Sequence, residues 1–197
     1  MSPGNSYFKD ENVKWLLQEV VQRFGKAAVL IADVPAIATY TALGYSGSEA
    51  RNKAIPKGNN LKNRTQRMME ELGFTNDVVR IIDWGTEVEN DPDYQQQYQR
   101  IKDLYDNNPL FRQKVDETTS AVLEGFGQEI GDMHTSVATA NHYLLAELAF
   151  LNLAPKFIGA SVINYIYHRP WAVYEDYIAG KFDTIPKPHL QFQLLKR

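Results

Sequence analysis

The chain has 197 residues with a formal net charge of −3, and 44% of its residues are hydrophobic and 23% charged. These values are typical of one ordinary soluble domain, and they exclude a disordered tail, a collagen-like fibre and a coiled-coil rod. Because the chain has no cysteine, disulfides, thiolate catalysis and cysteine–zinc sites are also excluded. We expect a single domain spanning 1–197, located in the cytoplasm, because the sequence has no signal peptide and no uninterrupted apolar stretch of ~20 residues.

The pattern of apolar residues predicts short buried strands that alternate with helices. Residues 10–24 repeat apolar side chains at helical spacing, and Gly25 ends that helix. The apolar runs at 27–33 and 78–82 are typical of strands buried on both faces of a parallel sheet, and 161–168 adds a strand rich in β-branched and aromatic residues. Further helices are predicted at 59–73, 94–106, 109–130 and 135–151. This alternation predicts an α/β fold with a central, mostly parallel sheet.

One segment of the chain departs from its overall acidity. No acidic residue lies between Glu49 and Glu70. The same stretch holds six basic residues, called here the basic segment: Arg51, Lys53, Lys57, Lys62, Arg64 and Arg67. A solvated helix face is the usual explanation of a run of charges. A merely soluble helix, however, mixes both signs, so a phosphate-binding face fits this segment equally well.

Several kinds of cofactor site are excluded by the sequence. It has no GxxxxGK[ST] motif, and no GxGxxG follows a predicted strand, which argues against P-loop and dinucleotide sites. The histidines do not have HExxH or similar metal-binding spacing: His134, His142, His168 and His189. We therefore expect neither a metal nor a cofactor.

Two groups of residues are candidates for catalysis. The segment SPGNSYF at 2–8 combines turn formers with two serines, so Ser2 is either a nucleophile or a turn or cap hydroxyl. Further along, Tyr143 and Glu147 are four residues apart and share one helix face. Glu147 lies in an apolar run, where a carboxylate needs a partner or a raised pKa. Both a functional and a purely structural role remain open for this pair.

Taken together, these segments resemble the cyclodipeptide synthases, which join the amino acids of two aminoacyl-tRNAs into a cyclic dipeptide. SPGNSYF resembles their nucleophile loop, and YLLAE at 143–147 resembles their tyrosine–glutamate pair. YHRPW at 167–171, together with Asn5, resembles the subgroup marked by asparagine, tyrosine and histidine. The resemblance runs from residue 2 to about residue 185. It implies a Rossmann-like three-layer domain similar to the catalytic domains of class I tyrosyl- and tryptophanyl-tRNA synthetases.

The resemblance implies a role for each matching position. The residues with implied catalytic roles are Ser2, Tyr143, Glu147 and Tyr167. Those with implied substrate-binding roles are Gly4, Asn5, Tyr94 and His168. Those with implied tRNA-binding roles are Lys53, Lys57, Lys62, Arg64 and Arg67. The ATP-binding signatures HIGH and KMSKS are missing, which fits a substrate that is already activated as an ester.

The implied reaction passes through a seryl acyl-enzyme. Ser2 takes the aminoacyl group of one tRNA, and a second aminoacyl-tRNA extends it to a dipeptidyl-enzyme. The free amine of the dipeptide then attacks its own ester and releases a diketopiperazine. We expect a monomer whose partners are aminoacyl-tRNAs and which uses neither ATP nor a membrane.

The chain departs from the family at its start. Family members carry a segment ahead of the serine loop that includes the first strand of the sheet, whereas here the serine is residue 2. We therefore expect a further strand upstream of Met1 that ends at Ser2. Two alternatives remain open: a truncated or inactive aminoacyl-tRNA-binding protein without turnover, and an N-terminal nucleophile hydrolase in which removal of Met1 exposes Ser2.

Overall fold

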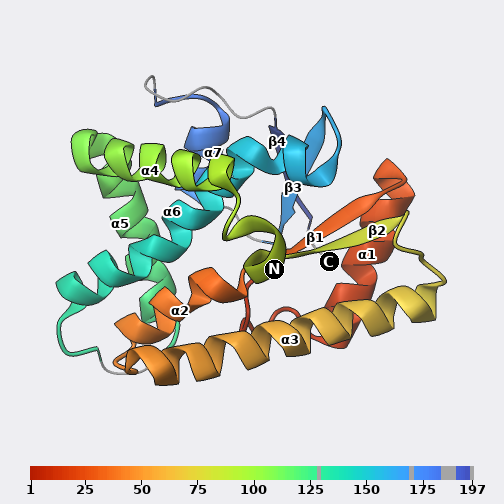
Figure 1. Ribbon diagram of the computed structural model, residues 1–197, viewed down its shortest axis with the longest axis horizontal. Coiled ribbons are helices and arrows are strands. Elements are labelled where there is room, and N and C mark those ends of the chain that lie inside the picture. Colours follow the sequence, from red (N-terminus) through yellow and green to blue (C-terminus); the bar gives the residue numbers. More distant parts are fainter. Residues whose placement is uncertain (128–129, 169–170, 183–189, 196–197) are drawn as a thin grey trace.

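The computed structural model describes residues 1–127, 130–168, 171–182 and 190–195 (Figure 1). Its helices are α1 (Asp10–Phe24), α2 (Asp33–Ala42), α3 (Gly47–Leu72), α4 (Pro92–Asn107), α5 (Pro109–Glu124), α6 (Met133–Ile158) and α7 (Ala172–Ile178), with a π-helical turn η1 (Trp84–Val88). Its strands are β1 (Ala27–Ile31), β2 (Val79–Asp83), β3 (Ile163–Tyr167) and β4 (Leu190–Leu194).

The strands pair in parallel, which confirms the predicted α/β class. β1 pairs with β2, with Ala27 opposite Val79, and β3 pairs with β4. In the described part of the chain these pairs form two separate two-stranded sheets. Met1 lies beside β1, where its backbone accepts a hydrogen bond from Ala32 N at 3.4 Å and its amino group donates to the carbonyl of Leu30. The further strand expected ahead of Ser2 stays a prediction.

Several elements differ from their predicted bounds. The helix predicted at 59–73 begins at Gly47, because Ser46 and Glu49 form a capping box there. The helix predicted at 135–151 extends to Ile158 before Gly159 ends it in the left-handed conformation. The helix predicted at 109–130 ends at Glu124, and its positions 128–129 lie outside the described residues. The elements not predicted are α2, η1, α7 and β4.

Two clusters of buried side chains form most of the core. The larger one packs α4, α5 and α7 around α6, and its members include Trp84, Phe111, Leu148, Phe150 and Tyr177. The second lies between α1, α3 and the β1–β2 pair, and its members include Val13, Leu17, Leu61, Met69 and Val79. Burial of each such side chain stabilises the fold by ~1.5–3 kcal/mol. Tyr143 packs against the first cluster and Met1 and Tyr167 against the second, so the junction of the two cores lies at the N-terminal loop.

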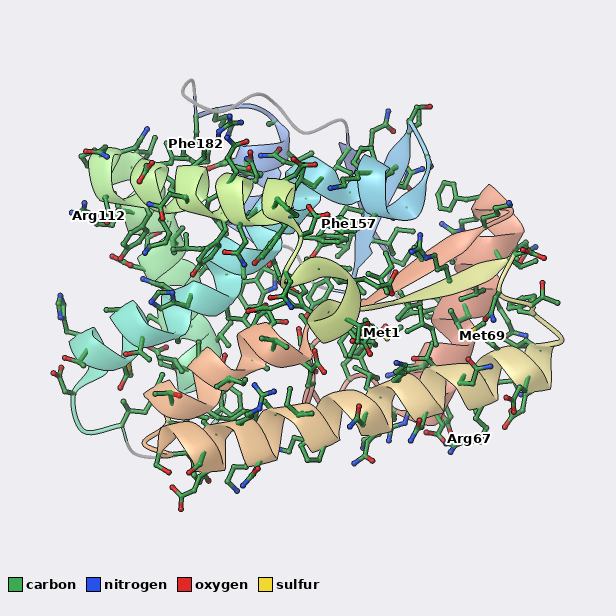
Figure 2. The ribbon with its side chains drawn as sticks, viewed as in Figure 1. Met1, Arg67, Met69, Arg112, Phe157 and Phe182 are labelled. Carbon is green, nitrogen blue, oxygen red and sulfur yellow. The ribbon has the colours of Figure 1, made fainter. Side chains whose placement is uncertain are left out.

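The long helix α3 runs along the lower edge of the molecule in this view (Figure 1). It contacts α2 on one side and α1 on the other. Figure 2 shows Met1 near the centre of the molecule and Arg67 on the outer side of α3. Among the described residues, no helix is both long and apolar enough to cross a membrane.

Candidate active site

The serine loop (residues 2–8) is built from two consecutive turns. Asn5 N donates to the carbonyl of Ser2 at 3.2 Å, with Pro3 and Gly4 between them. Proline followed by a glycine at φ +81° is the sequence of a type II turn. Phe8 N then donates to the carbonyl of Asn5 at 3.2 Å, while the Asn5 side chain accepts from Tyr7 N at 2.9 Å. These bonds fix the Ser2 backbone just ahead of α1.

Gly4 lets the loop approach α2 closely. A Cβ at this position would lie 2.6 Å from the hydroxyl of Tyr40, a contact that side chains do not make. The positive φ is a second reason for glycine, since residues with a Cβ rarely adopt it. Conformation and space therefore explain why residue 4 is glycine, and the predicted substrate-binding role of Gly4 stays a prediction.

The hydroxyl of Ser2 lies within hydrogen-bonding distance of two tyrosines. Its Oγ is 2.8 Å from the phenol oxygen of Tyr143 and 3.2 Å from that of Tyr167. The Tyr143 phenol in turn lies 3.0 Å from Oε1 of Glu147, one helical turn further along α6. The structure thus brings together the four residues with predicted catalytic roles, from the N-terminal loop, α6 and β3.

A single proton per phenol sets the direction of these bonds. When Tyr143 donates to the Glu147 carboxylate, its oxygen is free to accept the proton of Ser2. Burial raises the pKa of Glu147, against opposing effects of the Met1 ammonium and of the phenols that donate to it. Burial also raises the pKa of Tyr143 well above its usual value, so this phenol stays protonated. The arrangement can pass a proton from Ser2 through Tyr143 to Glu147.

A further tyrosine, which sequence reasoning missed, completes the surroundings of Glu147. Tyr174 on α7 donates a hydrogen bond to Oε2 of Glu147. Its side chain is only 4% exposed, and burial raises its pKa well above the usual value. The two residues are 27 positions apart in the chain, so no local spacing in the sequence links them.

His168 and Asn5 support the serine loop. The His168 ring stacks on Tyr7 with ring centroids 3.9 Å apart and meets Phe8 edge-on at 5.3 Å. Both aromatic residues belong to the serine loop, so His168 packs against the loop that carries the nucleophile candidate. Arg169 and Pro170, which belong to the same predicted motif, lie outside the described residues, as does His189. Substrate binding by Asn5 and His168 stays a prediction.

Tyr94 is a core residue of α4. It is 3% exposed, and its ring meets Trp84 edge-on at 5.6 Å and stacks on Tyr98 at 6.1 Å. Burial raises its pKa. These contacts place Tyr94 in the larger core cluster, and its role in substrate binding stays a prediction.

A polar cavity of about 260 Å³ opens beside Ser2 on the side of α3. Its walls come from the serine loop and α3: Ser2, Gly4, Asn5, Phe8, Lys57, Asn60, Leu61 and Arg64. The lining contains two cations and two amides and no carboxylate. Such a cavity suits a ligand with phosphate and hydroxyl groups.

Three of the six cations in the basic segment form ion pairs with carboxylates. Arg64 and Arg67 both bind Asp10 of α1, at 2.6 and 2.5 Å, and Lys62 binds Asp83 at 2.7 Å. Arg64 also donates to the carbonyl of Phe8, which ties α3 to the serine loop. These contacts give the three residues structural roles beside the predicted tRNA binding.

Lys53 and Lys57 have aromatic neighbours instead. Their ammonium groups lie 4.3 Å and 4.9 Å from the ring centroids of Tyr45 and Tyr40. No carboxylate lies within 4 Å of either ammonium group in the described ranges. Across those ranges, no group of three or more histidines and acidic residues could hold a metal ion.

The family model of the cyclodipeptide synthases matches residues 1–197. The chain belongs to this family. Among curated relatives, it is 25% identical over 169 residues to the cyclo(L-leucyl-L-phenylalanyl) synthase of Streptomyces noursei, which covers 85% of this chain and 70% of that protein. The resemblance stated from the sequence is thereby confirmed, and with it membership of a family of enzymes that form cyclic dipeptides.

Solved structures share the fold of this synthase. A Staphylococcus haemolyticus cyclodipeptide synthase superposes with a TM-score of 0.84 at 20% identity, over all of this chain and 88% of that chain. A Mycobacterium tuberculosis protein, described as relating cyclodipeptide synthetases to type I tRNA synthetases, superposes with a TM-score of 0.74 at 21% identity, over 90% of this chain and 74% of that one. The expected likeness to class I tRNA synthetases is confirmed for the fold.

Proposed function

We propose that this chain is a tRNA-dependent cyclodipeptide synthase that works through a seryl acyl-enzyme on Ser2. The observation that carries the proposal is the hydrogen-bonded series from Ser2 through Tyr143 to Glu147. A serine is a weak nucleophile unless a base accepts its proton. Glu147 is such a base, and Tyr143 joins the two groups.

In the first step, the Ser2 oxygen attacks the ester carbonyl of an aminoacyl-tRNA. The C–O bond to the terminal ribose breaks, and the proton of Ser2 passes through the Tyr143–Glu147 pair and ends on the ribose oxygen. One ester replaces another, so the step needs no ATP. Tyr167, 3.2 Å from the Ser2 oxygen, positions the acyl group or assists this proton transfer.

In the second step, the amine of the acyl-enzyme attacks the ester carbonyl of the second aminoacyl-tRNA. The dipeptide then stays on Ser2, as a dipeptidyl-enzyme requires, and the second tRNA leaves. The terminal amine then attacks the seryl ester, and the hydroxyl of Ser2 is restored. Ring closure needs a cis peptide bond, which costs ~2.5–4 kcal/mol, whereas well-oriented intramolecular attack lowers the barrier by ~7–11 kcal/mol. A site that holds the dipeptide still therefore closes the ring.

The cavity beside Ser2 supports aminoacyl-tRNA as the substrate. Tyr143 connects the Ser2 hydroxyl to Glu147, whose carboxylate suits the α-ammonium group of the amino acid. The cavity with Lys57 and Arg64 lies on the α3 side, where cations suit the terminal nucleotide of the tRNA. We expect a monomer that meets its substrates in the cytoplasm.

The proposal is tested by expressing the chain in a bacterium and analysing the medium for cyclic dipeptides by mass spectrometry. Incubation with radiolabelled aminoacyl-tRNA should also label the protein covalently. Ser2→Ala should abolish both the product and the label. Ser6→Ala is the matched control, since this exposed serine lies in the same loop and should keep both.

Two results would contradict the proposal. Equal labelling of the Ser2→Ala variant and the unaltered chain would show that Ser2 is not the acylated residue. Binding of aminoacyl-tRNA without label or product would favour the alternative of a binding protein without turnover.

A further inference from the structure

The carboxylate of Glu147 is held from two sides by phenols of different elements. Tyr143, on the same helix, lies 3.0 Å from Oε1. Tyr174, on α7, donates to Oε2. A carboxylate on a single donor can still rotate about its last side-chain bond, because that torsion has a broad minimum. Two donors from separate elements fix the plane of the group.

Tyr174 is itself held rigidly. Its ring stacks on Tyr165 of β3 with centroids 5.6 Å apart and planes 17° apart. Tyr165 in turn stacks on Tyr167 at 6.5 Å, the residue that contacts Ser2. The neighbours of Tyr174 on α7, Val173 and Tyr177, are buried. The phenol therefore reaches Glu147 from a packed support and not from a mobile loop.

We propose that Tyr174 is a positioning residue of the active site, which orients Glu147 so that Oε1 receives the proton of Ser2 through Tyr143. The inference rests on the proposed function. Oε2 is occupied by Tyr174, so Oε1 is the oxygen that faces Tyr143 and Ser2. Without Tyr174, the carboxylate can turn away, and the alignment with Tyr143 is no longer fixed.

Other groups also act on Glu147. Tyr143 donates to it from α6, and the Met1 ammonium lowers its pKa. Burial raises the pKa of Tyr165 of β3, and the nearby charge of Glu147 raises it further. Tyr174 is the phenol that donates to Oε2, so Tyr174→Phe removes the hydrogen bond to that oxygen.

The test is the Tyr174→Phe variant, which keeps the ring and removes only the hydroxyl. We expect the rate of Ser2 acylation to fall about 10- to 100-fold, as for loss of a hydrogen bond to a charged group. We expect KM for aminoacyl-tRNA to change less than about 3-fold. The rising limb of the rate against pH should move to higher pH, because loss of this donor raises the pKa of Glu147.

Tyr177→Phe is the matched control. Tyr177 lies one turn along α7, is equally buried, and bonds to Asn152 instead of Glu147. Its variant removes the same atom from the same helix and should leave the acylation rate and its pH profile unchanged. If Tyr174→Phe behaves as Tyr177→Phe does, the inference is overturned.

Two further measurements separate this inference from the proposed function. In a Glu147→Gln background, Tyr174→Phe should cause no additional loss of acylation, since it acts through Glu147; additive losses would contradict the inference. The titration of the ¹³C-labelled Glu147 carboxyl, assigned with Glu147→Gln, needs no turnover. Its midpoint should rise in Tyr174→Phe and not in Tyr177→Phe. An inactive unaltered chain would count against the proposed function, whereas an unmoved midpoint would count against Tyr174.

Discussion

Glu147 shows how a single residue combines two opposing requirements. Its place in the apolar stretch of α6 raises its pKa by burial, while two phenols stabilise its charged form. A residue kept only for stability would not need this balance, because a buried apolar side chain would serve better. The buried carboxyl thus makes the free energy of unfolding depend on pH.

Glu147→Gln should therefore change stability in a pH-dependent way. A carboxyl whose folded-state pKa is raised stabilises the fold below its unfolded-state pKa of about 4.3, and this contribution is lost as pH rises through the folded-state pKa. The variant has no such loss, so its free energy of unfolding relative to the unaltered chain should increase between pH 4 and pH 8. Urea denaturation at both pH values measures this. Glu175→Gln, at an exposed site on α7, is the control, and an equal response in both variants would contradict the prediction.

At the residue scale, the sequence could indicate only part of the candidate site. The i,i+4 spacing of Tyr143 and Glu147 is readable because one helix carries both. Ser2 and Tyr167 joined them through resemblance to a family, because no spacing brings residue 2 to β3. Tyr174 was missed because its bond to Glu147 depends on how α7 packs against α6. The catalytic roles themselves stay predictions.

At the scale of elements, α2 and α3 approach each other closely at one glycine. Gly58 of α3 faces Asp33, the first residue of α2. A Cβ on Gly58 would lie 2.3 Å from the Cβ of Asp33. That atom is fixed to the backbone and cannot swing aside. The close approach matters for the site because α2 carries Tyr40, against which the serine loop packs.

Gly58→Ala should destabilise the protein. In a helix, alanine is ordinarily more favourable than glycine by ~0.5–1 kcal/mol. Here the new methyl group forces the helices apart, and overpacking costs ~1–3 kcal/mol, so the clash outweighs the propensity. Gly47→Ala is the matched control, because a Cβ there meets nothing within 4 Å. Thermal unfolding should show a lower midpoint for Gly58→Ala and not for Gly47→Ala; equal midpoints would contradict the prediction.

The same helix shows which elements a sequence can and cannot predict. The sequence predicts strands β1, β2 and β3 to within two residues of their ends, because buried parallel strands are short apolar runs. The sequence does not predict the first three turns of α3, because Pro56 and Gly58 are usually helix breakers. The capping box at Ser46 and burial against α2 override both residues. The start of α3 is therefore set by capping and packing and not by local helix propensity.

At the scale of the whole molecule, the charges of α3 serve two purposes. Arg64 and Arg67 share the carboxylate of Asp10 and so join α3 to α1. Side-chain hydrogen bonds from Arg64 and, with a smaller effect, from Arg67 hold the pKa of Asp10 below its usual value. Lys53 and Lys57 lie nearer the N-terminus of the helix, and their ammonium groups make cation–π contacts with tyrosine rings. From the sequence alone, all these cations looked alike.

The division of α3 predicts which cations govern the salt dependence of tRNA binding. In the described residues, neither Lys53 nor Lys57 has a carboxylate within 4 Å, although Lys53 interacts with Glu49 at longer range. A phosphate therefore displaces no close ion pair to reach them, whereas the arginines must first give up Asp10. The Lys53→Ala/Lys57→Ala variant should flatten the slope of log affinity against log salt by about 1.4–1.8, since each lost phosphate contact contributes ~0.7–0.9. Alanine at both arginines should flatten it by less. Lys102→Ala/Lys114→Ala, with the same loss of charge on α4 and α5, is the control for net charge. Filter binding of aminoacyl-tRNA from 50 to 300 mM salt measures the slopes. Equal flattening by the lysine and arginine pairs would contradict the prediction, because it would show that phosphate displaces Asp10 from the arginines.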